Sequence, residues 1–169
     1  MQVLTISGSA RVDSSNIKLL NAIALLSPQF HFHHYQKLYQ LPLFLADDDK
    51  APFAKTVLTW RNEVKQADAL IIATPEYLHG IPALLKNALE WLSSSGELFE
   101  KPVLPITFTP HPPRGEKAMQ ALLNTLDALK ARVVGQLDLY KNDVKFDKDG
   151  KLINNETIEL LKISVSQFC

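Results

Sequence analysis

The sequence predicts a doubly wound α/β fold, in which helices cover both faces of a five-stranded, mainly parallel sheet. Apolar runs typical of buried strands alternate with segments whose apolar residues recur at helical spacing. Parallel strands need crossover connections, and right-handed crossovers through helices place a helical layer on each face of the sheet. The chain has 169 residues without a linker, repeat or low-complexity tract, so we expect a single domain over residues 1–169.

The first third of the chain shows a strand, a polar loop, a helix and a second strand. Val3–Ile6 is a short apolar strand, and the apolar positions of the following helix are Ile17, Leu20, Ile23 and Ala24. Phe30–Tyr35 is rich in β-forming residues and predicts the second strand. The loop after it, Leu38–Asp49, ends in three consecutive aspartates that we expect on a solvated surface.

The middle third predicts a helix, a buried strand and another helix. Pro52 fits the first position of a helix that continues to Ala67. The unbroken apolar run Ala69–Ala73 predicts the third strand. After a polar turn, the apolar positions of the next helix are Ile81, Leu84, Leu85, Ala88, Leu89 and Leu92.

The last third predicts two strands and two helices. Pro102–Phe108 is the fourth strand, and the inward positions of the helix after it are Met119, Leu122, Leu123, Leu126 and Leu129. Val133–Tyr140 is the fifth strand, and 146–151 is an exposed turn. The apolar positions of the closing helix are Ile158, Leu161, Val165 and Phe168.

Composition excludes several kinds of partner and chemistry. The 18 basic and 18 acidic residues cancel, and no apolar run approaches the ~20 residues of a membrane span, so we expect neither nucleic acid nor a membrane as partner. The chain start lacks the features of a signal peptide, and we expect a cytoplasmic protein. Cys169, the only cysteine, offers no internal disulfide or buried nucleophile, so redox chemistry needs a cofactor.

Two acidic or histidine-rich stretches are weaker candidates for function. His31 and His33 share one face of the second strand, but no cysteine or nearby carboxylate completes a metal site, and no metal is predicted. The acidic stretch Asp47–Asp49 is compatible with a signalling receiver domain of similar fold. However, the first strand ends without the acidic pair that such a domain requires.

Polar loops follow the first, third and fourth predicted strands. They are Ser7–Asn16, Thr74–Gly80 and Thr109–Gly115. In an open α/β sheet these loops converge at the carboxyl edge, where the strand order reverses and ligands bind. Their convergence predicts the functional site.

The first loop has the chemistry of a phosphate site. It combines four serine hydroxyls, the Asn16 amide and the Arg11 guanidinium with the amino end of a helix. It matches neither the G-x-x-x-x-G-K-[ST] loop of nucleoside triphosphate sites nor the G-x-G-x-x-G loop of dinucleotide folds, so a monophosphate fits better. The alternative is a purely structural role, in which these serines only cap the helix.

Two segments resemble those of a known family. Gly8–Asn16 resembles the G-S-x-R-x-x-S-x-N phosphate loop of the NADPH-dependent FMN reductase family. Thr74–Trp91 resembles that family's T-P-E-Y-N-x-[SG]-I-P-x-x-L-K-N-A-[IL]-[DE]-W segment. The resemblance covers about Val3–Val134, where Leu41–Phe44 and Ala67-Asp68 also match, and the chain is identified as a member of the family.

The resemblance implies a flavodoxin-like fold with strand order 2-1-3-4-5, FMN as cofactor and a homodimer or homotetramer that completes the flavin pocket. By resemblance, the FMN phosphate is held by Ser9, Arg11, Ser14 and Asn16. The isoalloxazine is lined by Pro75, Glu76, Tyr77 and Leu78, and Thr109 is the contribution of the third loop. The resemblance also implies that NAD(P)H passes a hydride to FMN, which then reduces a quinone or similar flat small-molecule acceptor.

The chemistry that the resemblance implies needs no catalytic side chain, because the flavin carries it. We expect Glu76 to position its loop through backbone hydrogen bonds and His79 to be a partly exposed loop residue. Arg114 and Lys117 are candidates to meet the 2′-phosphate of NADPH, but the choice between NADH and NADPH stays open.

The chain departs from the family pattern at two places. Leu78 stands where the family usually has Asn, and the typically glycine-rich third loop is here rich in proline, which removes backbone donors. Two alternatives to the reductase are a flavodoxin-type electron carrier and an FMN-binding protein without reductase activity. A carrier usually has a strongly acidic docking surface, which a net charge of zero does not favour.

Overall fold

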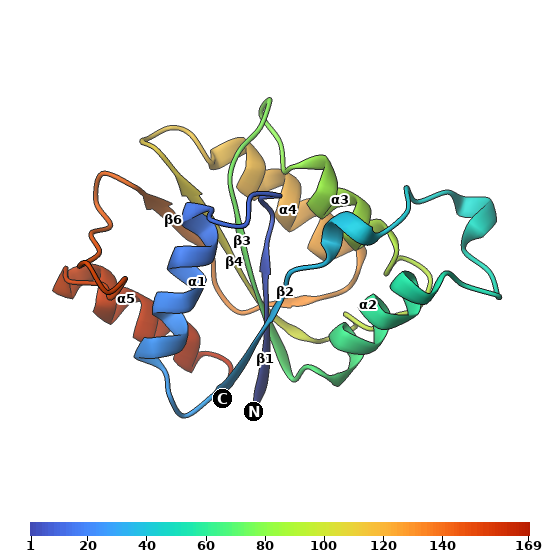
Figure 1. The fold of residues 1–169 in the computed structure, drawn as a ribbon, viewed down its shortest axis with the longest axis horizontal. Coiled ribbons are helices and arrows are strands. Elements are labelled where there is room, and N and C mark those ends of the chain that lie inside the picture. The colour runs from blue at the N-terminus through green and yellow to red at the C-terminus, as the bar shows by residue number, and fades with distance from the viewer.

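A parallel sheet with strand order β2-β1-β3-β4-β5 forms the centre of the molecule in a computed structural model, which describes residues 1–169 (Figure 1). The strands are β1 (Gln2–Ser7), β2 (His31–Tyr35), β3 (Ala69–Thr74), β4 (Pro102–Thr109), β5 (Arg132–Val133) and β6 (Leu137–Tyr140). Strands β5 and β6 both pair with β4, β5 near its start and β6 near its end. This order confirms the predicted 2-1-3-4-5 topology.

The fifth predicted strand is interrupted, so its prediction as one continuous strand over Val133–Tyr140 was wrong. Val103 of β4 pairs with Val133, and Ile106 pairs with Leu137. Three steps along β4 therefore correspond to four steps along the neighbouring segment, which leaves one extra residue, as in a β-bulge. Gly135 lies in the interruption, a position where glycine often marks such a break in a strand.

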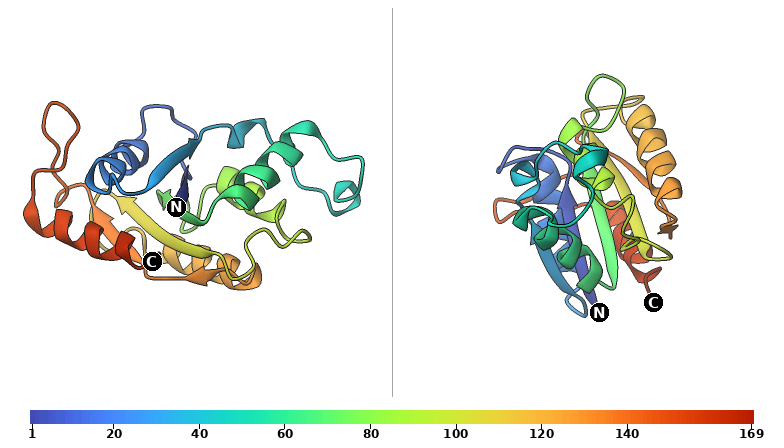
Figure 2. Two further views of the ribbon diagram at one scale, coloured as in Figure 1. Left: turned by 90° about the horizontal axis from the view of Figure 1, so that it is seen from below. Right: turned by 90° about the vertical axis from the view of Figure 1, so that its right-hand side faces the viewer.

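Helices cover both faces of the sheet (Figures 1 and 2). They are α1 (Ser15–Leu26), α2 (Lys55–Gln66), α3 (Ala83–Glu90), α4 (Glu116–Ala128) and α5 (Asn155–Ser166). Alternate residues of β3 point to opposite faces: Leu70 and Ile72 join the apolar core under α2, α3 and α4, and Ile71 joins the core under α1 and α5. None of these helices has the length and apolar content that a bilayer crossing requires.

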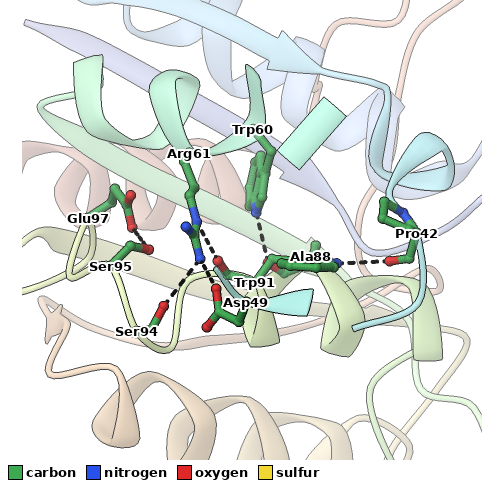
Figure 3. Close-up of polar contacts among 9 residues, drawn as sticks. All are labelled: Pro42, Asp49, Trp60, Arg61, Ala88, Trp91, Ser94, Ser95 and Glu97. Atoms are coloured by element: carbon green, nitrogen blue, oxygen red, sulfur yellow. Dashed lines mark hydrogen bonds and ion pairs between the residues drawn. The ribbon is translucent and has the colours of Figure 1, made fainter. Parts of the chain in front are cut away.

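A long loop with two short 3₁₀ turns, η1 (Leu38–Gln40) and η2 (Ala46–Asp48), connects β2 to α2 and runs out from the sheet beside α2 (Figure 2). The Asn87 side chain of α3 donates to Pro42 O at 2.9 Å and accepts from Phe44 N at 2.7 Å. Trp91 Nε1 also donates to Pro42 O, at 2.8 Å (Figure 3). Side chains at the end of α3 therefore hold this loop in place.

The end of the long loop differs from two sequence predictions. Helix α2 begins at Lys55 rather than at Pro52, because the backbone of its N-cap residue, Ala54, is extended, with ψ of 140°. The Phe53 ring just before it packs against the Arg61 guanidinium at 4.5 Å. Asp47 and Asp48 are exposed as expected, but Asp49 is not: its side chain pairs with Arg61 at 2.6 Å, and both side chains are only 9% exposed (Figure 3). Burial alone would raise the pKa of Asp49, but hydrogen bonds from Ser94 and Arg61 and the Arg61 charge lower it.

The histidines of β2 lie on the open edge of the sheet, with His31 and His33 exposed as predicted. Glu63 of α2 lies 3.1 Å from His33 Nε2. The spacing along the chain did not reveal this carboxylate, because it comes from another element.

Candidate functional site

The loops after β1, β3 and β4 meet at the carboxyl edge of the sheet and border a cleft of about 660 Å³. This volume is in the usual range of small-molecule sites. All nine residues named from the sequence line the cleft: Ser9, Arg11, Ser14, Asn16, Pro75, Glu76, Tyr77, Leu78 and Thr109. The predicted convergence of the three loops is therefore observed, and the binding roles of the individual residues remain predictions.

The serines of the first loop organise the loop itself. Ser14 Oγ accepts from Ile17 N at 3.2 Å and caps α1, as expected if the serines serve as helix caps. Ser7 Oγ accepts from Ser9 N at 3.2 Å, and Ser9 Oγ accepts from Arg11 N at 3.3 Å. These bonds fix the backbone of the loop, so that its remaining N–H groups have defined positions.

Several polar groups of the first loop have no partner within the chain. The N–H groups of Ser15 and Asn16 at the start of α1 donate no hydrogen bond, and the Asn16 side chain is 2% exposed with its Oδ1 unpaired. Free N–H groups at a helix start suit an anion, and an unpaired acceptor suits a hydroxyl donor. A phosphorylated sugar alcohol, such as the ribityl phosphate of FMN, offers both and fits this loop.

The Arg11 guanidinium lies at the rim of the cleft and pairs with Asp13 at 3.3 Å. Both side chains are mostly exposed, and a surface pair of this kind contributes about 1 kcal/mol at most. A phosphate can therefore replace Asp13 as the partner of Arg11 at little cost.

The second loop folds back as a tight two-residue hairpin. Tyr77 N donates to Gly80 O and Gly80 N donates to Tyr77 O, each at 3.0 Å. The two central residues, Leu78 and His79, have φ of +49° and +62°, in the left-handed region. This hairpin stands out above the carboxyl edge of the sheet as the green loop after β3 in Figure 1.

Glu76 joins the second loop to the third. Its Oε2 accepts from the N–H groups of Gly115, Lys117 and Ala118, each at 3.1 Å, at the start of α4. The expected positioning role of Glu76 is therefore confirmed, and its carboxylate, which is 9% exposed, occupies the amino end of α4 in place of any ligand anion. His79 is exposed as expected and lies 3.8 Å from Glu76 Oε1.

Two glycines and Thr109 hold the loops in close contact. A Cβ on Gly8 would lie 2.6 Å from Thr74 Oγ1, so only glycine lets the first loop approach the end of β3 this closely. Gly115 has φ of +112°, and a Cβ there would lie 2.8 Å from Thr107 Oγ1. Thr109 Oγ1 donates to Arg114 O at 2.6 Å and closes the proline-rich loop.

Two cleft residues, Lys18 and Lys141, were missed from the sequence. They line the cleft together with Arg11 and Arg114, so that cations outnumber the carboxylates Asp13 and Glu76. Lys141 directly follows β6, and its N–H donates to Thr109 O at 2.8 Å. Its position just after a predicted strand was the signal that could have found it, because every such position lies at the same edge of a parallel sheet.

A parallel sheet of order 2-1-3-4-5, with a basic cleft at the switch point, defines the flavodoxin-like class of α/β domains. Within this class, the chain belongs to the NADPH-dependent FMN reductase family, because the sequence profile of that family matches residues 1–143. The resemblance of the two sequence segments is thus confirmed over most of the chain.

Individual relatives agree with this assignment. The NADH:(hydroxy)cinnamate reductase subunit CrdA of Vibrio ruber is 39% identical over 173 residues, which cover 94% of this chain and 80% of the relative. A quinone reductase of Escherichia coli K12 is 29% identical over 175 residues, covering 99% of this chain and 93% of the relative. The structure of FerB, a flavoenzyme NAD(P)H:(acceptor) oxidoreductase from Paracoccus denitrificans, matches with a TM-score of 0.81 and 25% identity, covering 99% of this chain and 94% of FerB.

Proposed function

We propose that this chain is an FMN-dependent NAD(P)H oxidoreductase that reduces a quinone or a similar flat acceptor. The observation that carries the proposal is the cleft, where a loop with unpaired N–H groups and the unpaired Asn16 oxygen lies beside an open hairpin. FMN, when bound, supplies the ring that accepts a hydride from the nicotinamide and passes the electrons on. Family membership and relatives named quinone reductase and NAD(P)H:(acceptor) oxidoreductase support this choice of donor and acceptor.

The residues of the chain bind and orient in this proposal. Ser9, Arg11, Ser14 and Asn16 hold the phosphate, and the hairpin residues Pro75, Glu76, Tyr77 and Leu78 border the ring with Thr109. Glu76 acts on the ring indirectly, since its carboxylate is already bonded to the start of α4 and fixes the hairpin against that helix. Hydride transfer needs no protein base, so we assign none of these side chains a role in proton transfer.

We further propose that residues 1–169 form one domain, which works in the cytoplasm as a homodimer or homotetramer. The two apolar cores share the central sheet, which supports a single folding unit. The proposed donor, NAD(P)H, is present in the cytoplasm, which supports this choice of compartment. Light scattering of the purified protein measures the oligomeric state, and a monomer at micromolar concentration would contradict that part of the proposal.

The decisive experiment is the oxidation of NADH and NADPH by flavin-loaded protein with a quinone acceptor. We expect the absorption spectrum of bound FMN, bleaching on addition of a nicotinamide donor, and recovery on addition of the quinone. Protein that binds FMN but is inert to both donors would contradict the enzymatic proposal and leave a carrier or a flavin-binding protein instead. A chain that binds no FMN would contradict the cofactor assignment itself.

A further inference from the structure

Leu78 sits in an unfavourable conformation at the tip of the hairpin. Its φ of +49° crowds the Cβ against the following carbonyl, which is why two-residue turns of this kind favour Asn-Gly or Asp-Gly at their centre. Its side chain is 101% exposed, so the isobutyl group gains nothing from burial in the free chain. Leu78 thus combines a strained backbone with an apolar side chain exposed to water, and no contact within the chain offsets either cost.

The position of Leu78 links these costs to the cleft. Leu78 lines the 660 Å³ cleft and also a neighbouring hollow of about 310 Å³. The other residues of that hollow are mostly charged or polar: Glu76, His79, Pro113, Arg114, Glu116 and Lys117. Half-exposed Tyr77 precedes Leu78, so an apolar surface stands at the junction of the two hollows. Residues held in sparsely populated backbone regions cluster at active sites and ligand clamps, where the surrounding structure maintains the strain as part of the function.

We infer that the Leu78 side chain determines acceptor specificity by packing against the apolar ring of the electron acceptor at the mouth of the cleft. This inference rests on the proposed function and names the acceptor class as a flat, uncharged, apolar ring compound such as a naphthoquinone. The turn fixes the Leu78 backbone, so the side chain extends from a rigid base. Leu78 is then a contact for the acceptor, and the flavin is bordered mainly by the backbone of the same loop.

Leu78→Asn tests the inference with little risk to the fold, because Asn is well tolerated in the left-handed region. The control is Leu78→Met, which keeps an apolar side chain of similar size at the same backbone cost. Two measurements are made on flavin-loaded protein: the Kd of 2-methyl-1,4-naphthoquinone, from the change in flavin absorbance, and kcat/KM for the naphthoquinone and for ferricyanide, a charged acceptor without a ring. The Kd titration is made without a nicotinamide donor.

For Leu78→Asn we expect the naphthoquinone Kd to rise about tenfold, the scale of losing an apolar contact in a binding pocket. The ratio of kcat/KM for naphthoquinone to kcat/KM for ferricyanide should fall by a similar factor, and Leu78→Met should stay near the wild type. The melting temperature of Leu78→Asn should rise, because the turn is relieved of its strain.

Three results would overturn the inference. An unchanged naphthoquinone Kd means that the side chain does not touch the acceptor. A matching loss of FMN affinity means that it contacts the flavin instead, and a change in oligomeric mass means that it is buried by a second copy of the chain. Because the Kd titration needs no turnover, absence of NAD(P)H oxidation in the wild type contradicts the proposed function without deciding this inference, which the titration decides separately.

Discussion

At the residue scale, substitution of Asn16 should change FMN affinity and folding stability in different directions. An unpaired buried polar atom costs about 1–3 kcal/mol, and Asn16 Oδ1 is such an atom in the free chain. In Asn16→Ala this cost disappears together with a small amount of packing, and Ala is a better helix residue than Asn. The melting temperature of flavin-free Asn16→Ala should therefore equal or exceed that of the wild type.

The same substitution should weaken FMN binding several-fold to about tenfold, since Asn16 Oδ1 would accept from a ribityl hydroxyl and a neutral hydrogen bond contributes about 0.5–1.5 kcal/mol. Fluorescence titration of the flavin-free protein with FMN measures this loss. If Asn16→Ala unfolds at a clearly lower temperature and binds FMN normally, Asn16 is a structural residue and its assignment to the phosphate is wrong.

Arg11 offers a charge to the same phosphate from the exposed rim of the cleft. A charge-assisted hydrogen bond contributes about 1.5–3 kcal/mol, so Arg11→Ala should reduce FMN affinity about tenfold to a hundredfold. Stability should change little, because the pair with Asp13 lies in solvent. The matched control is Lys65→Ala, which removes an equal charge in the last turn of α2, at the opposite edge of the sheet. Equal FMN affinities for the wild type and Arg11→Ala would refute the assignment of Arg11.

At the element scale, Glu76 replaces the missing N-cap side chain of α4. The N-cap residue of this helix, Gly115, has no side chain, and Glu76 from the second loop accepts from three N–H groups of the first turn. Glu76→Ala leaves these donors without their acceptor and should lower the free energy of unfolding by about 2 kcal/mol or more. Glu76→Gln keeps an acceptor but loses the charge at the helix dipole, so about 1 kcal/mol is expected.

Urea denaturation of flavin-free protein measures both Glu76 variants. Glu116→Gln is the control, because it removes a carboxylate from the first turn of the same helix, at a side chain that makes no hydrogen bond to the helix start. Comparable losses in Glu76→Gln and Glu116→Gln would show that only the overall charge near α4 matters and that the bonds of Glu76 are dispensable.

The elements themselves could be predicted where local pattern and topology agree. The run Ala69–Ala73 is apolar at every position because β3 lies in the middle of the sheet with both faces covered. The start of α2 was misplaced because Pro52 fits a helix start equally well in isolation, and the local sequence does not show that the Ala54 backbone is extended and that the helix begins after it. The break at Gly135 depends on how residues 132–140 pair with β4. The hydrophobic pattern of the segment alone does not show this register.

The candidate site was predictable for a similar reason. Residues that follow parallel strands gather at one edge, which predicted the convergence of the three loops, and the family resemblance then selected the nine residues that line the cleft. Contacts between loops were not predictable, because they depend on tertiary distance. Glu76 and Gly115 are 39 residues apart in sequence, and the sequence around either residue does not identify the other as its hydrogen-bond partner. The aspartate triplet shows the same limit, since Asp49 is buried only because Arg61 lies opposite it.

At the scale of the whole molecule, His34 makes stability depend on pH. It lies on the edge strand β2, where its Nδ1 contacts Thr5 Oγ1 of β1 and its Nε2 lies 2.6 Å from Asn21 Oδ1 of α1. Burial, and secondarily the neighbouring His33, lower the pKa of His34 below its usual 6.5. The cations Arg11 and Lys37 line the hollow beside it, and no carboxylate lines that hollow to favour the protonated ring.

A lowered pKa in the folded state makes His34 destabilising in mild acid. Below pH 6.5 the unfolded chain binds a proton at His34 that the folded chain takes up only at lower pH, so the free energy of unfolding falls as the pH falls through this window. Urea denaturation at about pH 7.5 and about pH 5.5 should show a larger loss for the wild type than for His34→Gln, which cannot titrate. His31→Gln, on the same strand but exposed, should follow the wild type. Equal losses in the wild type and His34→Gln would place the acid sensitivity elsewhere in the molecule.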